Sequence, residues 1–156
     1  MHLRYELEGD GWAMATLTED EQSTSVEVSY LHDSLLQLTE ATIKLVSRES
    51  DEETVIFMGE PGEWHLVLRW FEHLHHGHYS LRQFQDWVSW GLWPETDFRR
   101  LQEGYFLALE PLGQNVLEQL DNIYDRYGMG GYRRAWIEHD FPYGAYQRLK
   151  GMVNRG

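Results

Sequence analysis

The chain has 156 residues, no cysteine and a formal net charge of −13. Without cysteine it has no disulfide scaffold, no cysteine-ligated zinc and no thiol nucleophile. Apolar residues make up 42% of the chain and charged residues 25%, a balance typical of globular proteins. The sequence contains no long apolar run that would span a membrane and no apolar signal-peptide core near its start. We therefore expect a single domain over residues 1–156, bacterial and cytoplasmic, with no membrane contact.

The negative charge is concentrated in the first part of the chain. Residues 1–63 carry 15 Asp and Glu against three Lys and Arg, a net charge of −12, whereas residues 64–156 carry a net charge of −1. Carboxylates repel a phosphate backbone and attract cationic side chains. We expect a basic protein partner and no nucleic acid, with solubility alone as the alternative role of this charge. The carboxylates expected to bind the partner lie in polar segments and are Glu19, Asp20, Glu21, Asp51, Glu52, Glu53 and Glu60.

The spacing of apolar residues predicts strands first and then a helix. Apolar and polar side chains alternate, as in half-buried strands, over residues 3–8, 12–18 and 24–30. Gly9-Asp10-Gly11 supplies a tight turn between the first two strands. After the third strand the apolar spacing becomes helical and predicts a helix over residues 33–47, with Asp33 or Ser34 as its N-cap.

The pattern then returns to strands. A turn is expected at residues 59–62, where proline is followed by glycine, and a polar loop or hairpin tip at residues 72–78. Residues 80–93 fit either a helix or a strand, and their Trp and Val content favours a strand. The strands expected in this part of the chain cover residues 54–58, 63–71, 80–93 and 101–109.

The last third of the chain is predicted to be helical. A helix begins at Pro111 and closes at Gly128, because glycine is favoured where a helix ends. A short helix near Trp136 and a final helix after Pro142 follow. The order of strands, helix, strands and helices predicts an α+β fold. We expect one antiparallel β-sheet of about six to seven strands, with the central helix and two to three C-terminal helices packed on one face.

Several turns and aromatic positions are shared with a known group of proteins. The segments are Gly11-Trp12-Ala13, Ser29-Tyr30-Leu31, Gly59-Glu60-Pro61-Gly62-Glu63, Gly131-Tyr132-Arg133-Arg134-Ala135-Trp136 and Phe141-Pro142. On these segments, across most of its length, the chain resembles a family of small, acidic bacterial proteins that have no assigned activity. The resemblance implies an immunity-type role, like that of proteins that neutralise bacterial toxins, and it carries over no catalytic residue.

A histidine cluster is the sharpest chemical feature of the sequence. Four imidazoles fall within six residues, at His73, His75, His76 and His78. In an extended segment, His76 and His78 lie on one side and form a usable pair for Zn²⁺, Ni²⁺ or Cu²⁺. Glu72 would add a carboxylate. The alternative is an exposed polar loop with no metal, because no further ligand can be identified elsewhere in the sequence.

Two other groups of residues have both a functional and a structural interpretation. Trp87, Trp90 and Trp93 recur at three-residue spacing and would either line a ligand groove or build the core of a sheet. Glu138-His139-Asp140 contains the residue types of a catalytic centre. Consecutive side chains in a loop seldom converge, however, so we interpret this triplet as coincidental.

The sequence contains no nucleotide-binding, serine-hydrolase or metalloprotease motif. We expect no cofactor and no catalytic residue, and we predict a non-catalytic, protein-binding domain: an immunity-type inhibitor that masks a basic partner with its acidic surface. The alternatives are a metal-dependent enzyme or metal binder that uses residues 72–78, and a small-ligand binder with a tryptophan-lined pocket.

Overall fold

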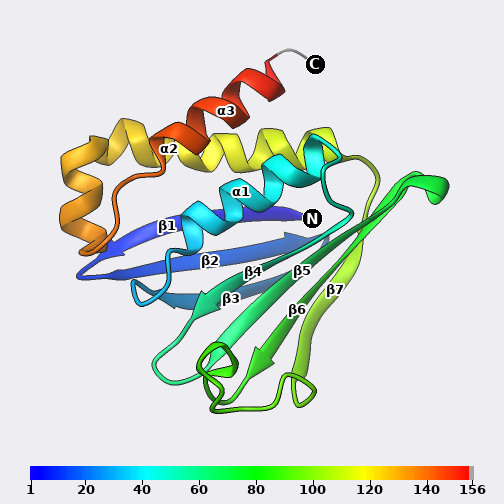
Figure 1. Ribbon diagram of the computed structural model, residues 1–156, viewed down its shortest axis with the longest axis horizontal. Coiled ribbons are helices and arrows are strands. Elements are labelled where there is room, and N and C mark those ends of the chain that lie inside the picture. The colour runs from blue at the N-terminus through cyan, green and yellow to red at the C-terminus, as the bar shows by residue number, and fades with distance from the viewer. Residues whose placement is uncertain (155–156) are drawn as a thin grey trace.

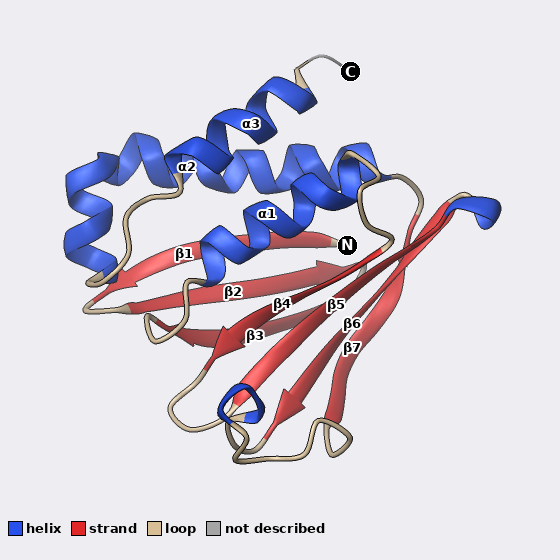
Figure 2. Ribbon diagram, in the orientation of Figure 1, coloured by secondary structure: helices blue, strands red, loops and turns tan. Residues whose placement is uncertain are grey.

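The computed structural model describes residues 1–154, which form two antiparallel sheets beneath a layer of helices (Figure 1, Figure 2). The first sheet has the order β1-β2-β3 and contains β1 (His2–Gly9), β2 (Trp12–Glu19) and β3 (Gln22–Ser29). The second has the order β4-β5-β6-β7 and contains β4 (Glu52–Met58), β5 (Glu63–Phe71), β6 (His76–Phe84) and β7 (Arg99–Phe106). The helices are α1 (Ser34–Val46), α2 (Leu109–Trp136) and α3 (Tyr143–Val153).

The expected α+β class with antiparallel strands is confirmed, but the expected single sheet is wrong. The strands divide into a three-stranded and a four-stranded sheet, and β3 and β4 come close together without sharing a ladder. Alternation of side chains identifies a strand and its buried face. It does not identify the neighbouring strand, so the pattern could not show where one sheet ends and the next begins.

Side chains, rather than backbone hydrogen bonds, join the two sheets. The Thr24 hydroxyl of β3 donates to Oε1 of Gln102 in β7 at 2.7 Å, and the Gln102 amide nitrogen donates to the Tyr79 hydroxyl at 3.2 Å. The Tyr79 hydroxyl in turn donates to the carboxylate of Glu19 at the end of β2. Because Tyr79 and Gln102 are buried, these bonds satisfy polar groups that have been removed from water.

Helix α1 lies where the spacing predicts it, over most of residues 33–47. Its N-cap is Asp33, whose carboxylate accepts a hydrogen bond from the first turn at 3.5 Å. Two threonines on its buried face, Thr39 and Thr42, donate their hydroxyls to carbonyls one turn earlier at 2.7 Å. These local bonds let a helix with polar side chains bury its inner face.

Helix α2 begins at Leu109, two residues before the expected start at Pro111. Proline is tolerated there because backbone N–H groups in the first turn have no helical partner. Gly128, with φ 61° and ψ −170°, breaks the helix as expected, and the short helix expected near Trp136 follows directly and ends at that residue. Helix α2 lies beside β1, α1 beside β4, and α3 on both helices, so the helices cover two sheets instead of one face of a single sheet. None of the helices within residues 1–154 is both long and apolar enough to cross a bilayer.

The polar loop or hairpin tip expected at residues 72–78 is the tip of the β5–β6 hairpin, but it is shorter than expected. The chain makes a short 3₁₀ turn, η1 (Glu72–Leu74), and then enters β6 at His76. Gly77 pairs with Trp70 of β5, and a Cβ atom at Gly77 would collide with the ring of Phe106. The glycine therefore marks a close approach inside a strand rather than a loop.

Two further boundaries differ from the expectation. The ambiguous segment 80–93 is a strand only as far as Phe84, after which it forms an irregular loop with a 3₁₀ turn, η2 (Val88–Trp90). The strand expected at residues 101–109 is β7, which starts and ends earlier. In the first segment, the tryptophans that favour a strand lie in the irregular loop instead.

Side chains of α2 cover the outer edge of β1. Asn115 accepts from the Leu3 N–H at 2.8 Å and donates to the Leu3 carbonyl at 2.9 Å. Gln119 accepts from the Tyr5 N–H at 3.2 Å, and the Tyr127 hydroxyl donates to the Leu7 carbonyl at 3.3 Å. The amides thus replace a neighbouring strand, and the edge is closed to pairing with another chain over this stretch.

Replacing Asn115 with leucine should destabilise the fold more than the same change at its neighbour Gln114. Asn115→Leu leaves the donor and acceptor of Leu3 without partners, a loss of about 1–3 kcal/mol in the free energy of unfolding. Gln114 is exposed and donates a long hydrogen bond, 3.5 Å, to the side chain of Glu110. Urea unfolding of both variants measures the difference, and equal stability would contradict the edge-covering role.

Candidate protein-binding site

A fully buried carboxylate lies at the lower end of the four-stranded sheet. Glu63, the first residue of β5, has no exposed surface and points away from the core, on the same face as His65. Its Oε1 accepts from the Ser89 N–H at 2.8 Å, and its Oε2 accepts from the Ser89 hydroxyl at 2.7 Å. The Nε2 atom of His65 contacts the same Oε2 at 2.5 Å. Three hydrogen bonds therefore hold one carboxylate.

These contacts keep Glu63 ionised. Burial on its own would raise the pKa of Glu63, but the hydrogen bonds from Ser89 and His65 favour the carboxylate more strongly, and its pKa lies below the ordinary value. Ser89 donates its hydroxyl to the carboxylate and not to an imidazole. The three residues consequently do not form a serine–histidine–acid relay, in which histidine lies between the other two.

Glu63 fixes the loop between β6 and β7, here named the tryptophan loop (residues 85–98). Ser89 lies in η2, and the turn ends at Gly91 in the left-handed region, with φ 73°. The indole of Trp87 donates to the Gly59 carbonyl at 2.9 Å, and that of Trp93 donates to the Asp97 carbonyl at 2.7 Å. The loop is thus tied both to β5 and to the turn at residues 59–62.

Aromatic packing supports the other end of the tryptophan loop. Phe98 packs on Phe84 of β6, with ring centroids 5.7 Å apart, and the Arg82 guanidinium lies 4.5 Å from the Phe98 ring centroid. Phe84 also contacts the His65 ring, with centroids 4.5 Å apart. The segment is long and irregular, yet it has defined partners on two strands.

The tryptophan loop leaves two large apolar side chains in solvent. Trp90 is 52% exposed and contacts Trp87, with ring centroids 4.5 Å apart and the rings tilted by 58°, and Leu92 is 58% exposed. Trp87 and Trp93 are only half buried. The three tryptophans therefore do not form the core of a sheet: two position the loop, and Trp90 is presented on its surface.

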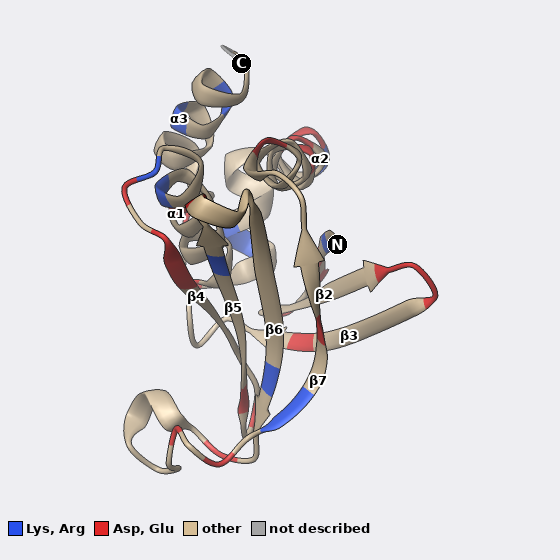
Figure 3. Ribbon diagram, turned by 90° about the vertical axis from the view of Figure 1, so that its right-hand side faces the viewer, with Lys and Arg blue, Asp and Glu red and all other residues tan. Residues whose placement is uncertain are grey.

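The tryptophan loop itself is acidic, whereas arginines flank it. It contains Asp86, Glu95 and Asp97 but no Lys or Arg, and Arg82, Arg99 and Arg100 lie on the strands that it joins. Glu60, in the turn that receives the Trp87 indole, adds a fourth carboxylate at the same end of the molecule. Figure 3 shows acidic segments on these loops, below the arginines at the ends of β6 and β7.

The structure does not bring the seven predicted partner-binding carboxylates together. Glu19, Asp20 and Glu21 form the β2–β3 hairpin tip, Asp51, Glu52 and Glu53 lie at the start of β4, and Glu60 lies beyond the other end of β4 (Figure 3). Several also have local partners: Glu52 pairs with Arg69 at 2.7 Å and Glu53 with Lys44 at 3.8 Å. Among the seven, Glu60 is the residue that adjoins the tryptophan loop.

The predicted histidine pair lies on one face of β6, as expected for an extended segment. His76 and His78 flank the ring of Tyr105, with centroids 5.5 and 5.3 Å away, and Nε2 of His78 lies 3.4 Å from Glu103. His73 and His75 belong to the turn before the strand. Within residues 1–154 no group of three or more His, Asp or Glu side chains is arranged to hold a metal ion. The imidazoles of His76 and His78 pack on an aromatic ring instead.

The triplet Glu138-His139-Asp140 has separate partners. His139 donates from Nε2 to the Tyr30 carbonyl at 2.9 Å and places Nδ1 3.7 Å from Asp33, whereas Asp140 pairs with Arg133 at 2.5 Å. The triplet connects α2 to the loop before α1. Its side chains do not converge on one point.

Comparison with known proteins adds no further information on the site. No family model, curated protein or solved structure matches the chain. The immunity-type role implied by the resemblance therefore stays an expectation, and the site is argued from its own geometry.

Replacing Glu63 with glutamine should lower stability at neutral pH, and the loss should shrink in acid. A carboxylate whose folded pKa is depressed stabilises the fold above its unfolded pKa, ordinarily 4.5, and this contribution disappears as the pH falls through the lower folded value. We expect Glu63→Gln to lower the free energy of unfolding by about 1–3 kcal/mol at pH 7. Exposed Glu60→Gln, in the neighbouring turn, is the control. A Glu63→Gln deficit that stays constant from pH 7 to acid would contradict the ionised state.

Proposed function

We propose that this protein is a non-catalytic, protein-binding domain that inserts Trp90 and Leu92 into a basic partner surface. The observation that carries the proposal is the exposure of two large apolar side chains on a loop that a buried, ionised carboxylate fixes. A soluble protein gains nothing in folding from presenting tryptophan to water. Such exposure is typical of interaction sites.

The rigidity of the tryptophan loop supports this role. Tryptophan is enriched among the few residues that contribute most of the binding energy at interfaces. A side chain that is already in place loses little conformational entropy on binding, so more of its burial is retained as affinity. Trp90 has this property, because Trp87 packs against it and Ser89, the residue before it, is held by Glu63.

The charge around the loop defines the chemistry of the partner. The loop that carries Trp90 and Leu92 has three carboxylates and no Lys or Arg, and Glu60 adds a fourth from the turn that receives the Trp87 indole. The flanking arginines, Arg82, Arg99 and Arg100, lie on the strands that the loop joins. This arrangement favours a partner with Lys or Arg around an apolar pocket, and it disfavours nucleic acid and anionic membranes. The net charge of −12 on residues 1–63 adds a wider field that speeds the encounter with a basic protein.

An immunity-type inhibitor is the specific form of this function that the resemblance implies. A basic toxin would be a partner of the right charge, and a bound domain of this size would block its surface without any chemistry. This form of the function does not use the hairpin carboxylates Glu19, Asp20 and Glu21 as direct contacts. They contribute through the long-range field.

The test is a comparison of immobilised wild-type protein with single-site variants in a pull-down from the native host. Trp90→Ala and Leu92→Ala should lose the partner that the wild type recovers, with about a 30-fold or greater loss of affinity for a residue of hot-spot rank. Met129→Ala is the matched control, since Met129 is 44% exposed on α2 and far along the chain from the loop.

The outcome is informative in both directions. The tryptophan loop is supported as the binding site if wild type and Met129→Ala retain the partner and Trp90→Ala loses it. Equal retention by all variants would contradict the site, and recovery of no basic partner at low and moderate salt would contradict the function.

A further inference from the structure

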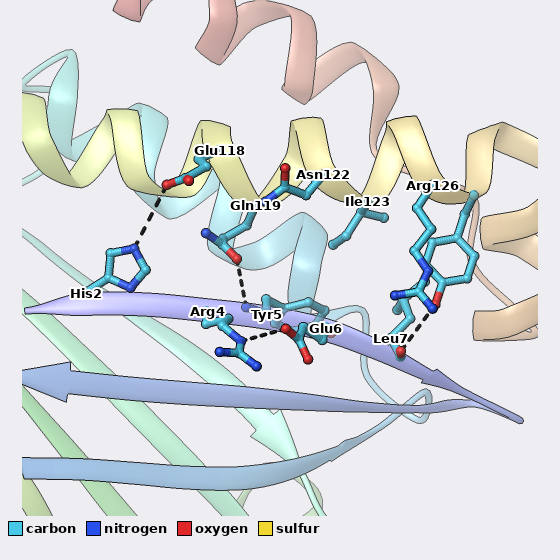
Figure 4. Close-up of a pocket in the computed structure, with 11 residues that line it drawn as sticks. His2, Arg4, Tyr5, Glu6, Leu7, Glu118, Gln119, Asn122, Ile123 and Arg126 are labelled. Carbon is cyan, nitrogen blue, oxygen red and sulfur yellow. Dashed lines mark hydrogen bonds and ion pairs between the residues drawn. The ribbon is translucent and has the colours of Figure 1, made fainter.

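A small cavity opens between β1 and α2, where the cover of the sheet edge is incomplete (Figure 4). Its volume is 220 Å³, below the roughly 300–1,000 Å³ of sites for drug-sized ligands. Buried residues form its floor: Tyr5, Leu7, Gln119 and Ile123. The space is that of a single amino-acid residue rather than of a cofactor.

Two backbone groups of β1 face this cavity without a partner among residues 1–154. The bonds from Leu3 and from the Tyr5 N–H to α2 show that the odd-numbered residues of β1 direct their backbone groups toward the helix. Gln119 pairs with the Tyr5 N–H, and the Tyr127 hydroxyl pairs with the Leu7 carbonyl. The Tyr5 carbonyl, an acceptor, and the Leu7 N–H, a donor, remain without a hydrogen-bond partner in the described part of the chain. They lie on either side of Glu6.

The spacing of these two groups fits one particular neighbour. In a parallel ladder, one residue donates its N–H to the carbonyl of one residue on the facing strand and accepts from the N–H two residues further on. A residue running parallel to β1 would therefore pair with the Tyr5 carbonyl and the Leu7 N–H together. The parallel direction places the carboxyl end of that residue beside Leu7.

The neighbour cannot extend as a strand in either direction. Its next bonds would go to the Tyr5 N–H and the Leu7 carbonyl, which Gln119 and Tyr127 already occupy. The cavity therefore accommodates one residue in ladder geometry, and on the side of Leu7 and Tyr127 the incoming chain has to end.

The end of the cavity next to Leu7 carries a cation. Arg126 lines the cavity together with Leu7, and its guanidinium lies 5.4 Å from the Tyr127 ring centroid (Figure 4). No carboxylate within residues 1–154 forms an ion pair with Arg126. The guanidinium is thus available to an anion beside the Leu7 N–H.

The remaining charges of the cavity are paired or lie further away. Arg4 pairs with Glu6 at 2.6 Å. Glu118 lies at the opposite end of the cavity, where its carboxylate is 4.0 Å from His2 (Figure 4). Arg126 is thus the cavity-lining cation at the Leu7 end, although the molecule as a whole is acidic.

We propose that this cavity binds the C-terminal residue of a peptide. The N–H of that residue donates to the Tyr5 carbonyl, one carboxylate oxygen accepts from the Leu7 N–H, and the other contacts the Arg126 guanidinium. The site is independent of the tryptophan loop, which lies at the lower end of the other sheet. It gives the protein a second way to hold a partner, through a free chain end.

The experiment is an NMR titration of ¹⁵N-labelled protein with N-acetyl-trialanine, which has a free carboxylate, and with its C-terminal amide. The carboxylate form should shift the Leu7 amide resonance with a Kd on the order of 1 mM. The amide form should bind at least about tenfold more weakly. Arg126→Gln should weaken the carboxylate form by about tenfold. Arg148→Gln is the matched control: Arg148 lies on α3 outside the cavity, where it pairs with Glu40, and its loss should leave the affinity unchanged.

Other outcomes would overturn the proposal. One is the absence of any shift of the Leu7 amide resonance up to about 10 mM peptide. The others are equal affinity for the free-carboxylate peptide and its amide, and equal affinity of Arg126→Gln and the wild type for the free-carboxylate peptide. Free alanine carries the same carboxylate on a single residue, and its tighter binding would assign the cavity to a free amino acid instead of a chain end.

Discussion

Glu63 is removed from water at the start of β5, and burying a carboxylate is costly unless its oxygens are hydrogen-bonded. Ser89 supplies two of those bonds and His65 a third. The same bonds determine where the tryptophan loop runs, because moving Ser89 away would leave the buried carboxylate without two of its three hydrogen bonds. The position of Trp90 on the surface follows from that constraint. The proposed binding site therefore depends on an interaction that lies beneath it.

The same principle operates elsewhere in the molecule: polar side chains take the place of a missing strand. Asn115 and Gln119 cover the edge of β1, and the bonds of Gln102 and Tyr79 join two sheets that share no ladder. Where this cover is complete, the edge is closed to other chains. Where it stops, beside Leu7, the backbone offers one acceptor and one donor, and the cavity inferred to bind a peptide end is the result. Fold and binding surfaces thus have a common physical origin.

Much of the local structure could be predicted from the sequence, because alternation and helical spacing record which side of an element is buried. The helix after Asp33 and the break at Gly128 are examples. The division into two sheets could not be predicted, since the residue pattern of a strand does not identify the strand that pairs with it. Of the site, the sequence indicates Glu60 and Trp90 as candidates but not Glu63. The signal for Glu63 is weak, because it is an acid next to a Pro-Gly turn and its burial depends on a loop 26 residues away. The predicted acidic surface combines residues from three separate places in the fold. Their separation follows from the arrangement of the strands and cannot be inferred from the sequence pattern.

The most direct test of this account is the hydrogen-exchange rate of the Ser89 amide in the free protein at neutral pH. If Glu63 fixes the tryptophan loop, that amide exchanges at least about 100-fold more slowly than in an unstructured peptide of the same sequence, since each factor of ten corresponds to about 1.4 kcal/mol of opening free energy. Exchange at the peptide's rate would show a loop that is free of the buried carboxylate, and the claim that Trp90 is held ready for a partner would be wrong.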